Sequence, residues 1–170
     1  YNQSLLASMI VANGIMKTQK WAEGLVKNFA RPPSGGDTDL LKATAAGQCN
    51  IALANTYYLG RMKNSESDQI RKAAENLEVF WPNQGENDRG AHVNVSGAGI
   101  TKYAKNIESG IALLEYLVKD ESQKWYAEVN NEYPVVDGVM MSDTLRGFGK
   151  FKADTLNLSK LGEMNAEAVK

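Results

Sequence analysis

Residues 50–60 read Asn50-Ile51-Ala52-Leu53-Ala54-Asn55-Thr56-Tyr57-Tyr58-Leu59-Gly60, a short apolar run followed by two polar residues and two adjacent tyrosines. The apolar run is typical of a buried strand. Asn and Thr both suit the N-cap of a helix, so the pattern predicts that a helix begins near Thr56. On its first turn, at the carboxyl edge of a sheet, both phenols would lean toward one crevice. Open α/β sheets bind ligands at this edge.

Helical and extended patterns alternate along the rest of the chain. Apolar spacing and capping residues predict helices over about 2–13, 18–30, 37–47, 68–76 and 107–119, with further helix starts near 120, 142 and 159. Two more strands are predicted over 77–81 and 91–95. Strands that alternate with helices indicate the α/β class.

Composition excludes several classes of function. The 170 residues are 43% hydrophobic, and 19 basic and 20 acidic residues give a net charge of −1. Because no basic stripe and no apolar run of bilayer length are present, we expect neither nucleic-acid binding nor membrane insertion. The single cysteine, Cys49, and the single histidine, His92, rule out a Cys/His zinc site within the chain. A structural role is the better interpretation of His92.

The tyrosine pair is the main candidate site. A phenolate is a hard, anionic oxygen donor that suits a highly charged cation such as ferric iron. The phenol pKa is ordinarily about 10, but a bound cation deprotonates its own ligand, and a helix N-terminus favours the anion. From the local pattern alone, however, packing is favoured over ligation. No paired carboxylates or nucleophile motif indicate an enzyme.

Several segments together resemble the periplasmic ferric-ion-binding proteins that serve ABC iron importers. The most specific are Asn55-Thr56-Tyr57-Tyr58-Leu59 and His92-Val93-Asn94-Val95-Ser96-Gly97-Ala98-Gly99. Further matches occur, in the order of the family, at residues 1–5, 30–33, 36–39, 89–91 and 131–135, whereas the last thirty or so residues match loosely.

This resemblance implies a set of site residues. In the family, the adjacent tyrosines, here Tyr57 and Tyr58, bind Fe³⁺ as phenolates. Members with the Asn-Thr-Tyr-Tyr motif use the tyrosine before Asn-Gln-Ser as a further ligand, which is Tyr1 here. Asn55 takes a position that contacts the synergistic anion, such as carbonate or phosphate, in some relatives.

The resemblance also implies an architecture and a cellular role. We expect a type II periplasmic-binding-protein fold, with two α/β lobes joined by a hinge and iron between them. Residues 1–88 would belong mostly to the second lobe, 89–138 would cross the hinge to the first, and 139–170 would return. The N-terminal lobe of the same protein would precede Tyr1. A periplasmic location and an inner-membrane ABC permease as partner follow from the family.

Two alternatives stay open. An oxyanion- or organic-solute-binding protein of the same fold would use the tyrosines for stacking and hydrogen bonding, without a metal. An α/β enzyme domain would use a tyrosine as general acid and need a nearby base, for which His92 is the only histidine.

Overall fold

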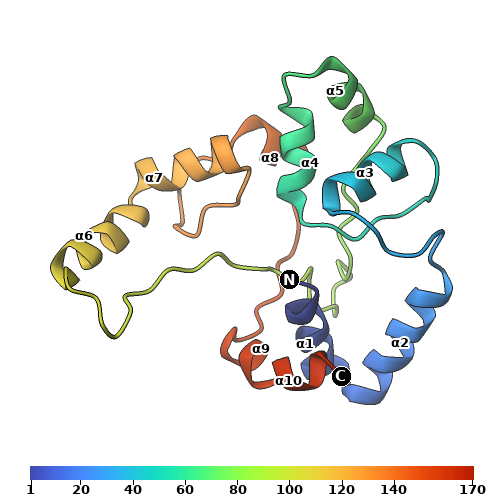
Figure 1. Cartoon of the computed structure of the whole chain (residues 1–170), viewed down its shortest axis with the longest axis horizontal. Helices are drawn as coiled ribbons and strands as arrows, with labels where there is room; N and C mark the ends of the chain where they lie inside the picture. Colours follow the sequence, from blue (N-terminus) through green and yellow to red (C-terminus); the bar gives the residue numbers. More distant parts are fainter. The chain divides into compact units, whose positions relative to one another are not determined.

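The structure of the protein is a computed structural model that describes residues 1–170. It consists of helices joined by long extended segments and turns (Figure 1). The α-helices are α1 (Asn2–Asn13), α2 (Ile15–Lys27), α3 (Asp37–Ala45), α4 (Thr56–Lys63), α5 (Asp68–Glu75), α6 (Ile107–Leu117), α7 (Asp120–Trp125), α8 (Asp143–Gly147), α9 (Ser159–Glu163) and α10 (Asn165–Ala168). A π-helix, η1 (Tyr126–Asn130), continues α7.

The chain divides into two compact units, each made of separate segments. Unit 1 contains Tyr1–Pro33, Phe80–Ser96 and Phe151–Lys170. Unit 2 contains Ser34–Val79 and Gly97–Lys150. The domain boundaries predicted from the resemblance, after residues 88 and 138, stay a prediction.

In unit 1, α1 packs against α2, α9 and α10, and Figure 1 shows α1 beside the two C-terminal helices. Ala7 and Ile10 of α1 are buried in this contact. The Arg89 guanidinium ties two other segments of the unit to α1, since its Nη1 donates to Oδ2 of Asp154 (2.8 Å) and to the carbonyl oxygen of Ser8 (3.2 Å). This paired arginine is mostly withdrawn from solvent.

In unit 2, α4 is the central helix and packs against α3, α5, α8 and η1. Its inward residues Leu59 and Met62 are buried, and Leu41, Ala74 and Leu145 from neighbouring helices are buried as well. The apolar face of α4 therefore fixes the helix in a small core, while its first turn, with the tyrosines, lies at one end of that core.

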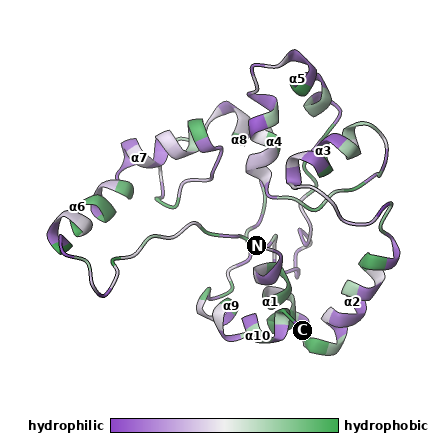
Figure 2. Cartoon of the chain, in the orientation of Figure 1, coloured by the Kyte–Doolittle hydropathy of each residue, from purple (hydrophilic) through white to green (hydrophobic).

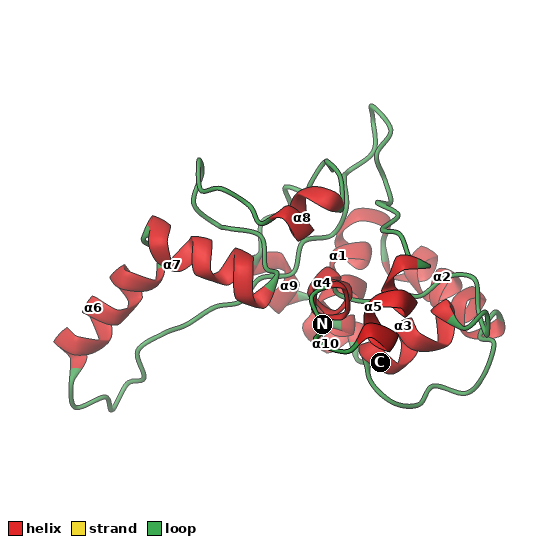
Figure 3. Cartoon of the chain, turned by 90° about the horizontal axis from the view of Figure 1, so that it is seen from above, coloured by secondary structure: helices red, strands yellow, loops and turns green.

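The predicted strands are wrong for this structure, which contains no β-strand (Figure 3). Residues 51–55 and 77–81 are extended or irregular, and Ile51, predicted to be buried, has 82% of its surface exposed. Of the segment 91–95, only Ala91 pairs, in an isolated parallel bridge with Ala153. The local patterns suit strands, but a strand also needs a neighbour for its backbone hydrogen bonds, and no other segment of this chain forms a ladder with them.

Most predicted helices are confirmed, with shifts of one to three residues at several C-terminal ends and one shifted start. The second helix begins at Ile15 rather than Thr18, because Gly14 adopts a φ of 82° and breaks the chain between α1 and α2. The Thr18 hydroxyl donates instead to the Gly14 carbonyl oxygen at 3.0 Å. Helix α3 has Gly36 at its N-cap, where the backbone N–H donates to Oδ2 of Asp39 (3.0 Å).

Helix α6 is the most apolar of the longer helices, as the green stretches in Figure 2 show, yet none of its residues is buried. Ile107, Ile111 and Leu113 all remain exposed. No helix in the chain has the length and apolar character that a membrane span requires.

Candidate metal centre

Tyr57 and Tyr58 lie on the first turn of α4, as the sequence predicts, and their rings are close to each other. The ring centroids are 4.4 Å apart and the ring planes are inclined by 36°. Both side chains are half-buried, so neither phenol is lost in the core of unit 2. Two adjacent residues on one helical turn therefore direct their phenols to a common place, which is the arrangement that chelation by both would need.

Asn55 is the N-cap residue of α4, but its side chain does not cap the helix. Its Nδ2 donates instead to the Tyr57 hydroxyl oxygen at 3.2 Å, and its backbone N–H donates to Oδ2 of Asp37 at 3.3 Å. The cap residue thus exchanges a helix-stabilising bond for one that orients the Tyr57 phenol.

Charged groups act on both tyrosines. The guanidinium carbon of Arg61 lies 5.3 Å from the Tyr57 ring centroid and 5.7 Å from that of Tyr58, within the range of cation–π contacts. Hydrogen bonding with Tyr57 and the charge of Tyr57 raise the pKa of the Tyr58 phenol, the Asp37 carboxylate adds to this increase, and the Arg61 charge lowers it. In the absence of a cation, the Tyr58 phenol is therefore protonated at neutral pH.

The donor set fits a hard metal ion. No group of three or more His, Cys, Asp or Glu side chains in the chain could hold a metal. The two tyrosines supply clustered oxygen donors of another kind, and phenolate oxygens match a small, highly charged cation better than a soft one. The N-terminus of α4, with its partial positive charge, lies beside them.

Tyr1 lies in unit 1, where it is the N-cap residue of α1, whereas the tyrosine pair lies in unit 2. Its carbonyl oxygen accepts hydrogen bonds from the Ser4 hydroxyl (2.7 Å) and the Leu5 N–H (3.1 Å). Its ring is exposed. The role of Tyr1 as a ligand stays a prediction.

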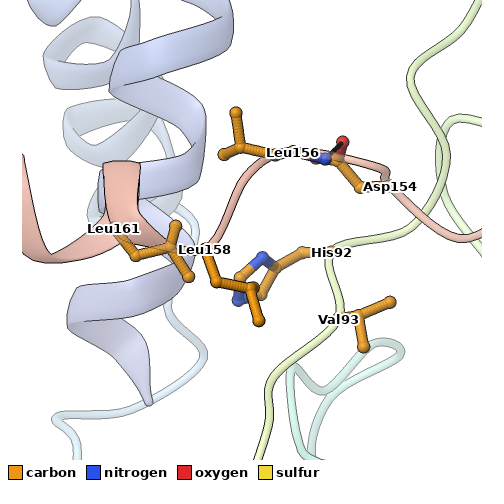
Figure 4. A pocket seen from close by; sticks show the side chains of 6 residues that line it. All are labelled: His92, Val93, Asp154, Leu156, Leu158 and Leu161. Carbon is orange, nitrogen blue, oxygen red and sulfur yellow. Dashed lines mark hydrogen bonds between the residues drawn. The ribbon is translucent and has the colours of Figure 1, made fainter. Parts of the chain in front are cut away.

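His92 lies in unit 1 and contacts α1 through Ser4. Its Nε2 lies 3.3 Å from the Ser4 hydroxyl, and burial, followed by the Arg89 charge, lowers its pKa. In Figure 4 its ring lies beside a small cavity that is also lined by Val93, Asp154, Leu156, Leu158 and Leu161. The cavity has a volume of about 10 Å³. This volume holds about one water molecule, so the cavity is too small for a solute.

Asp37 and Arg61 were not singled out as site residues in the sequence. Arg61 could have been found, since it follows Tyr57 by four residues and Tyr58 by three, and side chains at these spacings are neighbours on a helix. Asp37 could not, because its contact with Asn55 joins two separate helices of unit 2. The single cysteine, Cys49, forms no disulfide in the structure, and its Sγ lies 3.2 Å from the Thr44 hydroxyl oxygen.

Comparison with known proteins finds a matching family model and several relatives of this chain. The family model described as bacterial extracellular solute-binding protein matches residues 9–153. Iron uptake protein A1 of Synechocystis sp. is 48% identical over 170 residues, which cover all of this chain and 47% of that protein. The major ferric iron-binding protein of Neisseria meningitidis is 24% identical over 93% of this chain and 45% of its own length.

Solved structures agree in fold. A Trichodesmium protein in complex with iron and citrate ligands has a TM-score of 0.93 and 51% identity, covering 99% of this chain and 53% of that one. The ferric binding protein from Campylobacter jejuni has a TM-score of 0.93 and 37% identity, covering 98% and 52%. The chain thus has the backbone fold of part of these proteins. It spans about half the length of the curated relatives that it matches.

Proposed function

The chain belongs to the bacterial extracellular solute-binding protein family, and from this premise we propose that it binds ferric iron through the phenolates of Tyr57 and Tyr58. It would carry the ion to an importer and would catalyse no reaction. The observation that carries this proposal is the convergence of the two phenols, with ring centroids 4.4 Å apart at the N-terminus of α4.

Three features of the pair support binding of a trivalent cation. Its oxygens are the hard donors that ferric iron prefers. Asn55 donates a hydrogen bond to the Tyr57 hydroxyl oxygen, and this bond fixes the orientation of the Tyr57 phenol. The Arg61 guanidinium beside both rings offsets part of the repulsion between two adjacent phenolates.

The relatives add further parts to the proposal. The names of the curated relatives include iron uptake, ferric iron binding and, for the Serratia marcescens protein, a periplasmic location. By extension, this chain would act in the periplasm and deliver iron to a membrane permease of the ABC type. We propose Tyr1 as a third ligand and Asn55 as a contact to a synergistic anion, for which the citrate in the Trichodesmium complex is a precedent. The two-lobe closure and the boundaries at residues 88 and 138 belong to the same proposal.

Colour tests the central claim. Ferric iron bound by phenolate gives a visible charge-transfer band, so a weakly chelated ferric salt should turn the intact protein red to purple. The double variant Tyr57→Phe with Tyr58→Phe should lose the band, because it removes both phenolic oxygens and preserves the rings. Tyr103→Phe is the matched control, since Tyr103 is 84% exposed and lies beside a cation, Lys102, whose Nζ is 5.6 Å from the ring centroid.

Either of two results would refute the proposal. One is a wild-type protein that stays colourless with ferric iron, and the other is a band that persists in the double phenylalanine variant. Tight calorimetric binding of an oxyanion to the colourless, metal-free protein would support the solute-binding alternative in its place.

A further inference from the structure

A buried asparagine lies against the middle of the helix that carries the tyrosine pair. Asn131 follows η1 and is 2% exposed. Its backbone has a φ of 58° and a ψ of 36°, the left-handed region that few residues other than glycine and asparagine adopt. π-Helices are rare, and those that occur often lie at functional sites. The π-helix η1 therefore ends at a left-handed residue, Asn131, whose side chain is buried in unit 2.

Asn131 lies so close to α4 at Gly60 that a side chain at position 60 would clash with it. A Cβ built on Gly60 would lie 2.6 Å from both Cβ and Cγ of Asn131 and 2.9 Å from its Oδ1. Carbon atoms in favourable contact lie about 3.5–4.0 Å apart. Gly60 is buried, so the contact is not relieved at the surface. The position of α4 relative to η1 thus depends on the absence of a side chain at residue 60.

Two hydrogen bonds extend this contact to a third helix. Asn64, the C-cap residue of α4, donates from Nδ2 to Oδ1 of Asn131 at 2.9 Å. The hydroxyl of Thr144, in α8, donates to Oδ1 of Asn64 at 3.0 Å. The C-terminal half of α4 is therefore held both by a steric contact and by a polar chain through Asn131.

The tyrosines stand on the same rigid helix, less than one turn away. Gly60 follows Tyr57 by three residues and Tyr58 by two, a separation of about 3–5 Å along the axis at 1.5 Å per residue. A shift of α4 at Gly60 moves both phenols with it. We propose that Asn131 is a positioning residue for the tyrosine pair, which sets the place of both phenol oxygens through Gly60 and Asn64. This inference rests on the proposed function.

The experiment enlarges the side chain at position 60 and then removes the one at position 131, in the intact protein. Gly60→Ala adds a methyl group against Asn131 and should weaken ferric binding about 10- to 100-fold, the usual effect of disturbing residues that orient ligands. It should also shift the charge-transfer maximum. Adding Asn131→Gly to this variant frees space for the methyl group, so the maximum and the affinity should recover to those of Asn131→Gly alone, in which the hydrogen bond from Asn64 is also lost. Gly24→Ala is the matched control, because a Cβ on this helical glycine meets nothing within 4 Å.

Affinity and the absorption maximum are measured on folded protein, with thermal unfolding followed in parallel. A structural role alone would lower the unfolding midpoint and leave the maximum and the affinity unchanged. The inference would be overturned if Gly60→Ala kept the wild-type affinity and absorption maximum, or if neither quantity recovered in the double variant. If Gly60→Ala does not fold, Asn131→Gly alone decides, since glycine accepts the φ of 58°. It should bind at least about tenfold more weakly, and unchanged binding would overturn the proposal.

The proposed function fails in a different way. A wild-type protein without a charge-transfer band would refute iron binding by the tyrosines, and this inference with it. A coloured wild type with an unaltered Gly60→Ala variant would leave iron binding intact and refute only the role of Asn131.

Discussion

Substitution of Tyr57 by phenylalanine should change the number of protons that the protein releases when it binds ferric iron. A phenol has an ordinary pKa of about 10, and hydrogen bonding with Tyr57 raises the pKa of Tyr58 further. Iron must therefore displace one proton from each phenol that it binds at neutral pH. Tyr57→Phe removes one of these protons and keeps the ring that lies at a tilt against the Tyr58 ring.

The size of the effect follows from proton linkage. Each proton that is released makes the apparent association constant rise about tenfold per pH unit, so the pair contributes a rise of about 100-fold per unit. Tyr57→Phe should reduce that contribution to about tenfold. The variant also removes the largest cause of the raised Tyr58 pKa, so Tyr58 should ionise more easily than in the wild type.

Calorimetry in buffers with different ionisation enthalpies measures the proton count directly. The same ferric chelate is titrated into each protein, so protons taken up by the chelator cancel in the difference between variants. The wild type should release one proton more than Tyr57→Phe and one more than Tyr58→Phe, and Tyr103→Phe should equal the wild type. Equal proton counts in the wild type and in both pair variants would refute phenolate ligation, whatever the affinities are.

The remaining predictions concern stability, measured as the free energy of unfolding in denaturant. Gly90→Ala should lower the free energy of unfolding by about 2–5 kcal/mol, because Gly90 has a φ of 93° and a Cβ there would lie 2.6 Å from the Lys152 carbonyl oxygen. At Gly138 the φ is 84° and a Cβ would meet nothing within 4 Å. Gly138→Ala should therefore lower the free energy of unfolding only by the backbone strain, about 1–2 kcal/mol. Met62→Ala should cost about 2–5 kcal/mol at a site that is 2% exposed, whereas Met16→Ala, 85% exposed, should stay within about 0.5 kcal/mol. Equal losses within either pair would contradict the packing described.

Local features of the fold could be predicted from the sequence, and non-local ones could not. The bounds of α1 and α5, the start of α4 and the convergence of the tyrosines depend on residues within one or two turns, where capping and helical spacing act. The strands failed because ladder pairing joins distant segments, and the one bridge observed links Ala91 to Ala153. The apolar pattern of residues 51–54 describes a segment suited to a sheet but does not supply its partner.

The candidate site divides in the same way. Tyr57, Tyr58 and Asn55 are neighbours in sequence, and Arg61 lies one turn further, so their chemistry is present in a window of seven residues. Asn131 reaches the same helix from 71 positions beyond Gly60, and no periodicity connects the two. The only local signal at Asn131 is that asparagine tolerates the left-handed conformation after a helix, which indicates a helix end and says nothing about its contact.

The charges around the pair explain why a highly charged cation is the fitting ligand. Ionising the second of two adjacent phenols is opposed by the first, which is why the charge of Tyr57 raises the pKa of Tyr58, and Asp37 adds to that opposition. Arg61 carries a single positive charge and offsets only part of it. An ion that holds both phenolates must overcome this repulsion and displace two protons, and the gain in Coulomb energy grows with the charge of the ion. A trivalent ion therefore gains more from this pair than a divalent ion of similar size. A neutral solute gains nothing from ionising the phenols and would leave both protons in place.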